Sequence, residues 1–190
     1  MRQGNLFVIS GPSGAGKGTL VARLVERIPQ AWLSVSATTR APREGEIDGV
    51  HYFFLDDNAF DKLVEENGFL EWANVHTARY GTLKEVVEQH IAAGDQVILE
   101  IDVQGGFQIK EQIPGAHLVF IEPPSIEELE RRLRGRGTED EASILKRMEN
   151  ALVEISQKNE YDVQFVNDDL DVCTDELVAF IEKQANKNKD

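Results

Sequence analysis

The strongest chemical signal in the sequence is a glycine-rich segment with one lysine, GPSGAGKGT from Gly11 to Thr19. A short apolar run, Leu6–Ser10, precedes it, and apolar residues at helical spacing follow it. Glycines allow backbone N–H groups to converge on phosphate oxygens at a helix N-terminus, and Lys17 adds a positive charge. The alternative is a plain turn with a surface lysine, which the flanking strand and helix disfavour. We therefore predict a phosphate-binding loop.

This loop departs from the strict pattern at one position, because Gly18 stands where Ser or Thr follows the lysine and Thr19 comes one residue later. Direct and water-mediated binding of Mg²⁺ by Thr19 therefore both stay open. Asp102 directly follows a second apolar run, Val97–Ile101. A carboxylate at the end of a buried strand beside a phosphate loop organises Mg²⁺. Its alternative role is to cap the helix that follows.

A second group of residues suits a phosphate monoester. Arg40 and Arg43 lie three residues apart, and Tyr52 follows nine residues later. Arginine forks pair bidentately with phosphate oxygens, and a phenol adds another donor. Taken singly, each arginine is also compatible with a solvated basic turn.

A third group is a cluster of arginines between residues 125 and 147. Arg132 and Arg136 would share one face of a helix, which costs stability unless an anion lies between them. Neighbouring glycines provide a hinge. The alternative is a helix with ion pairs to glutamates, which suits Arg131 and Arg134. The cluster comprises Arg131, Arg132, Arg134, Arg136 and Arg147.

The sequence shows no constellation for nucleophilic catalysis, since it has four histidines and the single Cys173 in no such arrangement. Phosphoryl transfer to a phosphate monoester needs no such group, because the second pKa of the monoester is about 6 and its oxygen is already anionic. One cysteine also excludes a disulfide framework and favours a reducing compartment. We expect a cytoplasmic protein.

Strands that alternate with helices predict a three-layer α/β fold with a parallel sheet and helices on both faces. Segments 36–83 and 125–147 are expected as insertions into one core. An extended region is expected over 33–55, and Thr82 and Glu85 form a candidate capping box. Strands are predicted at 6–10, 96–101, 117–121 and 163–166, and helices at 19–28, 56–66, 82–93, 125 onward, 139–158 and the C-terminus.

Composition limits the partners. The 190 residues carry 20 basic and 34 acidic side chains, a net charge of −14, which argues against nucleic acid or an anionic membrane as a partner. The acidic excess lies mainly in 44–75 and 148–190, away from most of the residues proposed to meet phosphate. No apolar run is long enough to span a membrane, and the N-terminus does not predict a signal peptide.

With these residues in view, the chain resembles the guanylate kinase family. Segment 38–54 matches the family's signature at each fixed position, and the resemblance extends through Val166–Asp169. It implies a three-layer P-loop kinase core with a parallel sheet, and transfer of the γ-phosphoryl of ATP to GMP with Mg²⁺ to give ADP and GDP. The implied division is a core (1–35, 84–124 and 148–190), a GMP-binding region (36–83) and a mobile lid (125–147).

The resemblance also implies roles for individual residues. Catalysis falls to Lys17, Arg132, Arg136 and Arg147. ATP is expected at Gly11, Ser13, Gly14, Ala15, Gly16, Lys17, Gly18, Thr19 and Asn167. GMP is expected at Ser36, Arg40, Arg43, Tyr52, Glu71, Tyr80, Gly81, Thr82 and Asp102, with Asp102 and Thr19 near the metal.

Guanine chemistry supports these assignments. A carboxylate at Glu71 accepts from N1–H and the 2-amino group, and a hydroxyl donates to O6. Adenine would leave these groups unpaired, a rejection on the order of 10⁴. Without the resemblance, Glu71 reads as a solvated charge beside Trp72. Two departures from the family pattern, Arg79 and segment 103–106, are expected to tune the site.

Two alternatives stay open at this point. One is a kinase for another monophosphate, because the order of Lys17, Gly18 and Thr19 also resembles adenylate kinases. The other is a non-catalytic scaffold of the same fold that binds phosphopeptides, which the intact Lys17 disfavours. Use of dGMP is expected, and the sequence leaves the oligomeric state, monomer or homodimer, undetermined.

Overall fold

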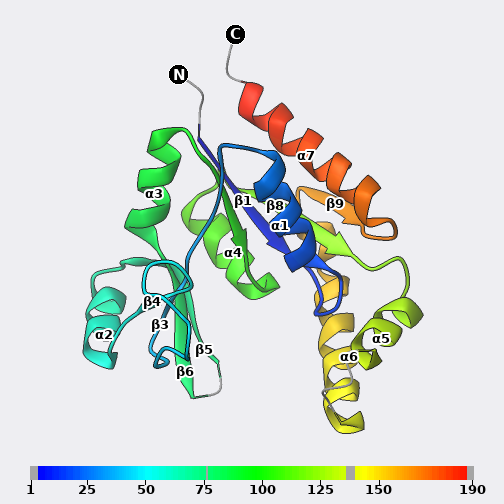
Figure 1. Cartoon of the computed structure of the whole chain (residues 1–190), viewed down its shortest axis with the longest axis horizontal. Helices are drawn as coiled ribbons and strands as arrows, with labels where there is room; N and C mark the ends of the chain where they lie inside the picture. The colour runs from blue at the N-terminus through cyan, green and yellow to red at the C-terminus, as the bar shows by residue number, and fades with distance from the viewer. Residues whose placement is uncertain (1–3, 76, 136–139, 188–190) are drawn as a thin grey trace.

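The computed structural model describes residues 4–75, 77–135 and 140–187 (Figure 1). Its central sheet has the strand order β2-β7-β1-β8-β9, and every neighbouring pair is parallel. This arrangement brings the carboxyl ends of β1 and β7 side by side. The phosphate loop follows β1, and Asp102 follows β7. The strands are β1 (Asn5–Ser10), β2 (Ala31–Leu33), β7 (Gln96–Glu100), β8 (His117–Glu122) and β9 (Val163–Val166).

Helices cover both faces of this sheet because alternate strand residues point to opposite sides. Phe7 and Ile9 of β1 pack against α1 (Lys17–Arg27) and α7 (Leu170–Asn186). Leu6 and Val8 face the opposite side, where α3 (Lys84–Ala93) and α4 (Val103–Gln112) lie. The three-layer α/β prediction is confirmed.

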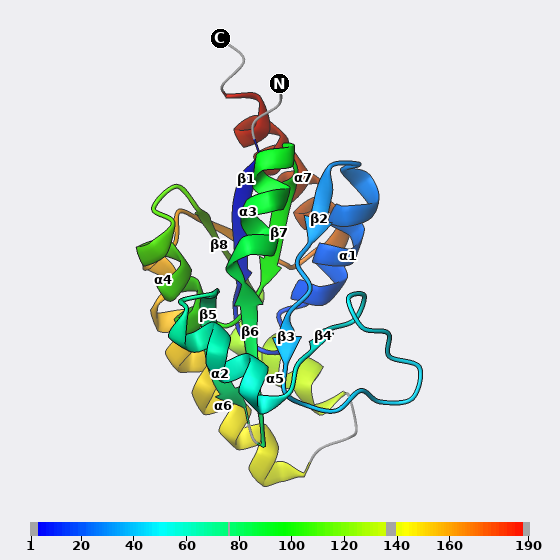
Figure 2. The same ribbon diagram turned by 90° about the vertical axis from the view of Figure 1, so that its left-hand side faces the viewer.

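A second, smaller sheet lies below the central one and has the order β4-β3-β6-β5 (Figure 2). Phe60 of the adjoining helix packs against Phe69 of this sheet with ring centroids 4.4 Å apart. The sequence predicted extended structure before residue 55 but missed the antiparallel β5–β6 pair. The elements are β3 (Ala37–Thr38), β4 (Phe53–Phe54), α2 (Asp57–Glu65), β5 (Phe69–Val75) and β6 (Ala78–Leu83).

Polar side chains cap helices at Asp56 and Ser125, whereas the capping box predicted at Thr82 does not form. Asp56 caps α2 by accepting from Ala59 N–H at 2.7 Å, and Ser125 caps α5 (Ile126–Arg134). The capping box predicted at Thr82 is wrong. Thr82 belongs to β6, and its hydroxyl donates to Glu71 at 2.6 Å, so no side chain among the described residues caps α3.

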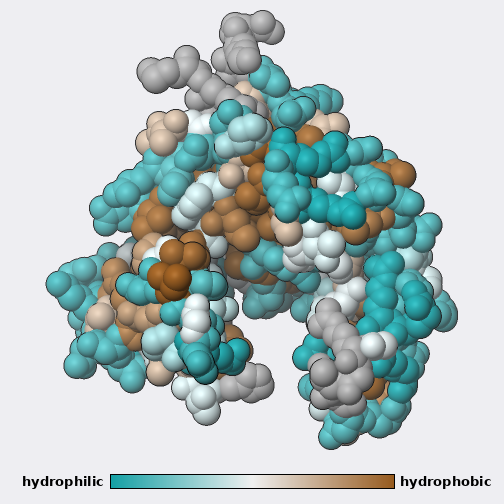
Figure 3. Space-filling model, viewed as in Figure 1, coloured by the Kyte–Doolittle hydropathy of each residue, from teal (hydrophilic) through white to brown (hydrophobic). Residues whose placement is uncertain are grey.

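The lower part of the molecule is open between two lobes, as Figure 3 shows. One lobe holds the smaller sheet with α2, and the other holds α5 and α6 (Glu141–Ser156), which a short 3₁₀ turn at Lys158–Glu160 follows. Helix α6 runs without a break past residue 147, so a boundary at that residue falls inside a helix. Among the described residues, no helix has the length and apolarity needed to cross a membrane.

Candidate active site

The phosphate loop owes its shape to glycine and to a contact with a distant strand end. Gly16 caps α1 in the left-handed region (φ 90°). Asn167, just past β9, donates from its side chain to the Ala15 carbonyl at 2.7 Å. A Cβ on Gly16 would lie 2.4 Å from that Asn167 nitrogen, so both the backbone angle and the space require glycine here.

Lys17 is the first residue of α1, which begins two residues earlier than the predicted helix at 19–28. Its ammonium donates to the carbonyls of Gly11 (2.6 Å) and Pro12 (3.1 Å). Arg147 reaches the same loop from α6 and donates to the Ser13 hydroxyl at 3.1 Å. A hollow of about 320 Å³ opens beside the loop, lined by Ser13, Gly14, Gly16, Lys17, Gly18, Thr19 and Glu100.

The phosphate-monoester residues gather at the smaller sheet. The Arg40 guanidinium lies 5.3 Å from the Tyr52 ring centroid, and the Tyr52 and Tyr80 rings are 5.9 Å apart. Glu46 forms a bidentate ion pair with Arg40, which holds the pKa of Glu46 at about 2, and the pKa of Arg40 is raised. Arg43 joins this group through its backbone N–H, which donates to Glu46 at 2.7 Å.

Residues expected to bind GMP also come together around Glu71. Glu71 of β5 accepts from the Thr82 hydroxyl at 2.6 Å. Carboxylate oxygens of Glu71 and Asp102 lie 3.5 and 3.6 Å from the point where a Cβ on Gly105 would stand. Burial raises the pKa of Glu71, and the Asp102 charge adds to the rise, while the Thr82 hydrogen bond opposes it. Gly81 has a packing role, because a Cβ there would stand 2.8 Å from the Phe69 ring.

Asp102 fulfils its alternative role as well. Its Oδ1 accepts from Gly105 N–H at 2.8 Å and caps α4. This bond leaves the second carboxylate oxygen, Oδ2, for other contacts. Capping and ligand binding are therefore compatible at this residue.

Sequence reasoning missed Glu100, which links the two halves of the site. Glu100 lines the hollow at the phosphate loop and also a pocket of about 170 Å³ at the smaller sheet. Its carboxylate lies 3.7 Å from the position of a Cβ on Gly18. The available signal was a charged residue closing an otherwise apolar strand. The second pocket is lined by Leu33, Ser34, Ser36, His51, Tyr52, Thr82, Leu99, Glu100 and Ile101.

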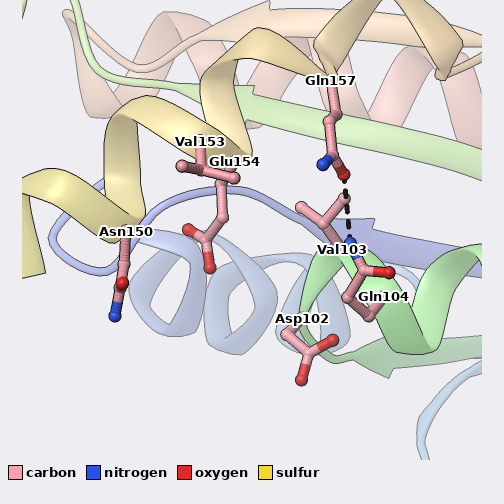
Figure 4. Close-up of a pocket in the computed structure, with 7 residues that line it drawn as sticks. All are labelled: Asp102, Val103, Gln104, Asn150, Val153, Glu154 and Gln157. Atoms are coloured by element: carbon pink, nitrogen blue, oxygen red, sulfur yellow. Dashed lines mark hydrogen bonds between the residues drawn. The ribbon is translucent and has the colours of Figure 1, made fainter.

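Sequence reasoning also missed Glu154, seven residues after Arg147 on α6 and therefore on the same helix face. Figure 4 shows Glu154 and Asp102 directed toward one pocket of about 300 Å³ between α6 and the start of α4. A hydrogen bond of 3.3 Å between Gln104 and Gln157 closes one end of that pocket. Burial raises the pKa of Glu154, while the Lys17 charge opposes the rise.

Two arginines of the cluster, Arg131 and Arg134, form the ion pairs with glutamates that the alternative interpretation predicted. Arg131 pairs with Glu128 at 2.6 Å, and Arg134 pairs with Glu130 and Glu141. Arg132 bonds Glu128 at 2.8 Å and the Asn167 carbonyl at 3.1 Å, at the edge of the phosphate loop. Arg136 lies outside the described residues.

Oxygen donors around the loop fit Mg²⁺ in part. No group of three or more His, Cys, Asp or Glu side chains that could hold a metal forms within 4–75, 77–135 and 140–187. The Thr19 hydroxyl and the Glu100 and Asp102 carboxylates are nevertheless the ligand type that Mg²⁺ prefers. Magnesium usually takes one or two carboxylates, with water and substrate phosphates as its other ligands.

A glycine-rich loop between β1 and α1, a lysine at the helix start and a parallel sheet define a P-loop protein that binds nucleotide phosphates. The family model for guanylate kinase matches residues 3–184. The chain belongs to the guanylate kinase family and is an enzyme of the transferase class.

Individual relatives agree. A guanylate kinase of Synechococcus sp. (strain CC9311) is 53% identical over 179 residues, which cover 94% of this chain and 92% of that protein. A guanylate kinase of Thermobifida fusca is 53% identical over 176 residues, covering 93% and 90%. The crystal structure of guanylate kinase from Anaplasma phagocytophilum superposes with a TM-score of 0.75 at 31% identity, covering 98% of this chain and 89% of that one.

Proposed function

We propose that the protein transfers the γ-phosphoryl group of ATP to GMP and to dGMP, giving ADP and the corresponding diphosphate. The observation that carries this proposal is the shared position of Glu100. Glu100 lines both the hollow at the phosphate loop and the pocket beside Tyr52 and Thr82. Two anionic ligands in these pockets would meet at one place, as direct transfer between them requires.

ATP occupies the phosphate-loop side. Backbone N–H groups of the loop and the α1 N-terminus bind its phosphates. Lys17 exchanges its bonds to the Gly11 and Pro12 carbonyls for phosphate oxygens, and Arg132 and Arg147 neutralise charge on the transferring group. The proposed contacts are Gly11, Ser13, Gly14, Ala15, Gly16, Lys17, Gly18, Thr19 and Asn167, and Arg136 is proposed for the same role as Arg132.

GMP occupies the side of the smaller sheet. Arg40, Arg43, Tyr52 and Tyr80 bind its phosphate, and Glu71 accepts from the guanine N1–H and 2-amino groups. The deoxy analogue has the same base and phosphate, so these contacts serve dGMP equally. Further contacts are proposed for Ser36, Gly81, Thr82 and Asp102.

No residue is needed as a general base. The GMP phosphate is largely dianionic at neutral pH because its second pKa is about 6. The protein's contribution is to align the two phosphates, neutralise their charge and exclude water from the γ-phosphate.

Magnesium completes the set of charges. Thr19, Glu100 and Asp102 would hold it, directly or through water. When bound, the ion neutralises charge on the phosphate oxygens.

The functional division of the chain is proposed in the same terms. Residues 1–35, 84–124 and 148–190 form the core, 36–83 the GMP-binding region and 125–147 a lid. Closure of the two lobes over both substrates would shield the γ-phosphate from water.

The test is ADP release from ATP measured with GMP, dGMP, AMP, CMP and UMP in turn. We expect rapid turnover with GMP and dGMP, and kcat/KM for AMP lower by on the order of 10⁴. A preference for AMP would identify a different monophosphate kinase. Absence of turnover with every acceptor would favour the non-catalytic scaffold.

A further inference from the structure

A half-buried ion pair lies beside the residues proposed for the acceptor phosphate. Glu46 Oε1 and Oε2 accept from the two terminal nitrogens of Arg40 at 2.8 and 2.9 Å. The Arg40 and Glu46 side chains are only 18% and 17% exposed. Every other residue from 41 to 50 is exposed, so Glu46 is the one residue of this stretch that is partly buried.

The loop between β3 and β4 needs such a contact. Residues 39–52 contain no regular strand or helix, yet they carry Arg40, Arg43 and Tyr52. Glu46 connects the start of the loop to its middle, because it also accepts from Arg43 N–H at 2.7 Å. An unrestrained arginine side chain loses rotamer entropy when it binds a ligand, and a bidentate partner within the protein removes that entropy before any ligand arrives.

The ion pair leaves part of the Arg40 guanidinium unused. Glu46 and the Ala41 carbonyl together take three of its five N–H groups. The Nε atom is buried and has no hydrogen-bond partner among the described residues. Aromatic rings of Tyr52 and Phe54, with centroids 5.3 and 5.8 Å from the guanidinium carbon, restrict its plane. The remaining terminal N–H faces Tyr80, so a phosphate that enters between Arg40 and Tyr80 does not have to displace Glu46.

We infer that Glu46 is a positioning residue for the acceptor phosphate: it orients Arg40 and the Arg43 segment and touches no substrate itself. This inference rests on the proposed function. It makes a prediction opposite in sign to simple electrostatics. Removal of a negative charge beside an anion site would by itself tighten GMP binding, whereas loss of a positioning residue weakens it.

The test is Glu46→Gln, with Glu44→Gln as the matched control. Glu44 is exposed in the same loop, so its replacement removes the same charge without the ion pair. GMP dissociation constants come from isothermal titration calorimetry, and KM and kcat come from the ADP-release assay. We expect Glu46→Gln to weaken GMP binding about tenfold. The kcat and the KM for ATP of Glu46→Gln should stay within about twofold of wild type, because the positioned group binds only the acceptor. The control Glu44→Gln should bind GMP within about twofold of wild type.

A second comparison isolates the route through Arg40. Lysine has no planar guanidinium that could pair bidentately with Glu46. In an Arg40→Lys background, Glu46→Gln should therefore change the GMP dissociation constant by less than about twofold. Circular dichroism shows whether Glu46→Gln folds. If it does not, Glu46→Asp serves as the second variant, because it keeps the charge and should retain part of the affinity for GMP.

Unchanged or tighter GMP binding by folded Glu46→Gln would overturn the inference. A tenfold weaker GMP affinity for Glu46→Gln in the Arg40→Lys background would also overturn it, as would equal increases in KM for GMP and ATP. These results differ from failure of the proposed function, in which the wild-type protein itself does not phosphorylate GMP.

Discussion

Replacement of Glu71 by glutamine should separate binding of guanine from stability of the fold. Glu71 is half-buried and accepts from Thr82 at 2.6 Å. Glutamine keeps one oxygen for Thr82, but its amide N–H₂ would face the guanine donors. Hydrogen bonds to a charged group contribute about 1.5–3 kcal/mol. Loss of one such bond together with a donor–donor conflict therefore costs about 3–4 kcal/mol, or about 10²–10³ in kcat/KM for GMP.

The same substitution should not destabilise the free protein. Burial raises the pKa of Glu71 above its unfolded value. A raised pKa contributes stability below the unfolded pKa, and that stability is lost as pH rises through the folded pKa. At neutral pH the ionised carboxylate is thus a net cost, and Glu71→Gln removes it. We expect a melting temperature equal to or above that of wild type, with the difference shrinking at acidic pH.

The assay compares Glu71→Gln with Glu65→Gln, an exposed glutamate at the end of α2 that serves as control. Steady-state KM and kcat are measured for GMP and ATP in turn, and unfolding is followed by circular dichroism. The wild-type KM for GMP should also rise as pH falls through the raised pKa of Glu71, a rise that the Gln variant lacks. Equal changes in KM for GMP and ATP would remove Glu71 from the base pocket.

Three further substitutions test other parts of the site. Asp102→Asn keeps a good helix cap for Gly105 N–H but removes the charge. Its melting temperature should therefore equal that of wild type, while kcat falls. A variant with wild-type kcat would show that Asp102 only caps the helix. Asn167→Ala removes the buried bond to the Ala15 carbonyl, which should cost about 1–2 kcal/mol, and should raise the KM for ATP but not for GMP. Lys17→Ala should lower kcat by on the order of 10²; an unchanged kcat would refute the phosphate-loop assignment.

Local sequence patterns predicted the parts of the site that local chemistry determines. The phosphate loop, Asp102 and the central strands each depend on a contiguous run of residues. Their positions in the structure follow from strand alternation and from glycine conformations at Gly16 and its neighbours. The resemblance added Glu71, which no local pattern distinguishes from a surface charge.

Contacts between distant segments account for what the sequence did not reveal. Thr82 and Glu85 match a capping box, but the Thr82 hydroxyl bonds Glu71 across the β5–β6 pair instead. That pair itself went unrecognised because the apolar residues of Phe69–Val75 do not alternate strictly. Glu100 and Glu46 gain their importance only where pockets or ion pairs join segments that the sequence separates.

A crystal structure with GMP bound would show directly where the acceptor lies. We predict that the GMP phosphate lies within hydrogen-bond distance of Arg40, Arg43, Tyr52 and Tyr80, and that the guanine edge lies on the Glu71 carboxylate. We also expect the phosphate to face the loop at Lys17 across Glu100. A base that lies away from Glu71, or a phosphate bound outside the pocket beside Tyr52, would contradict these predictions.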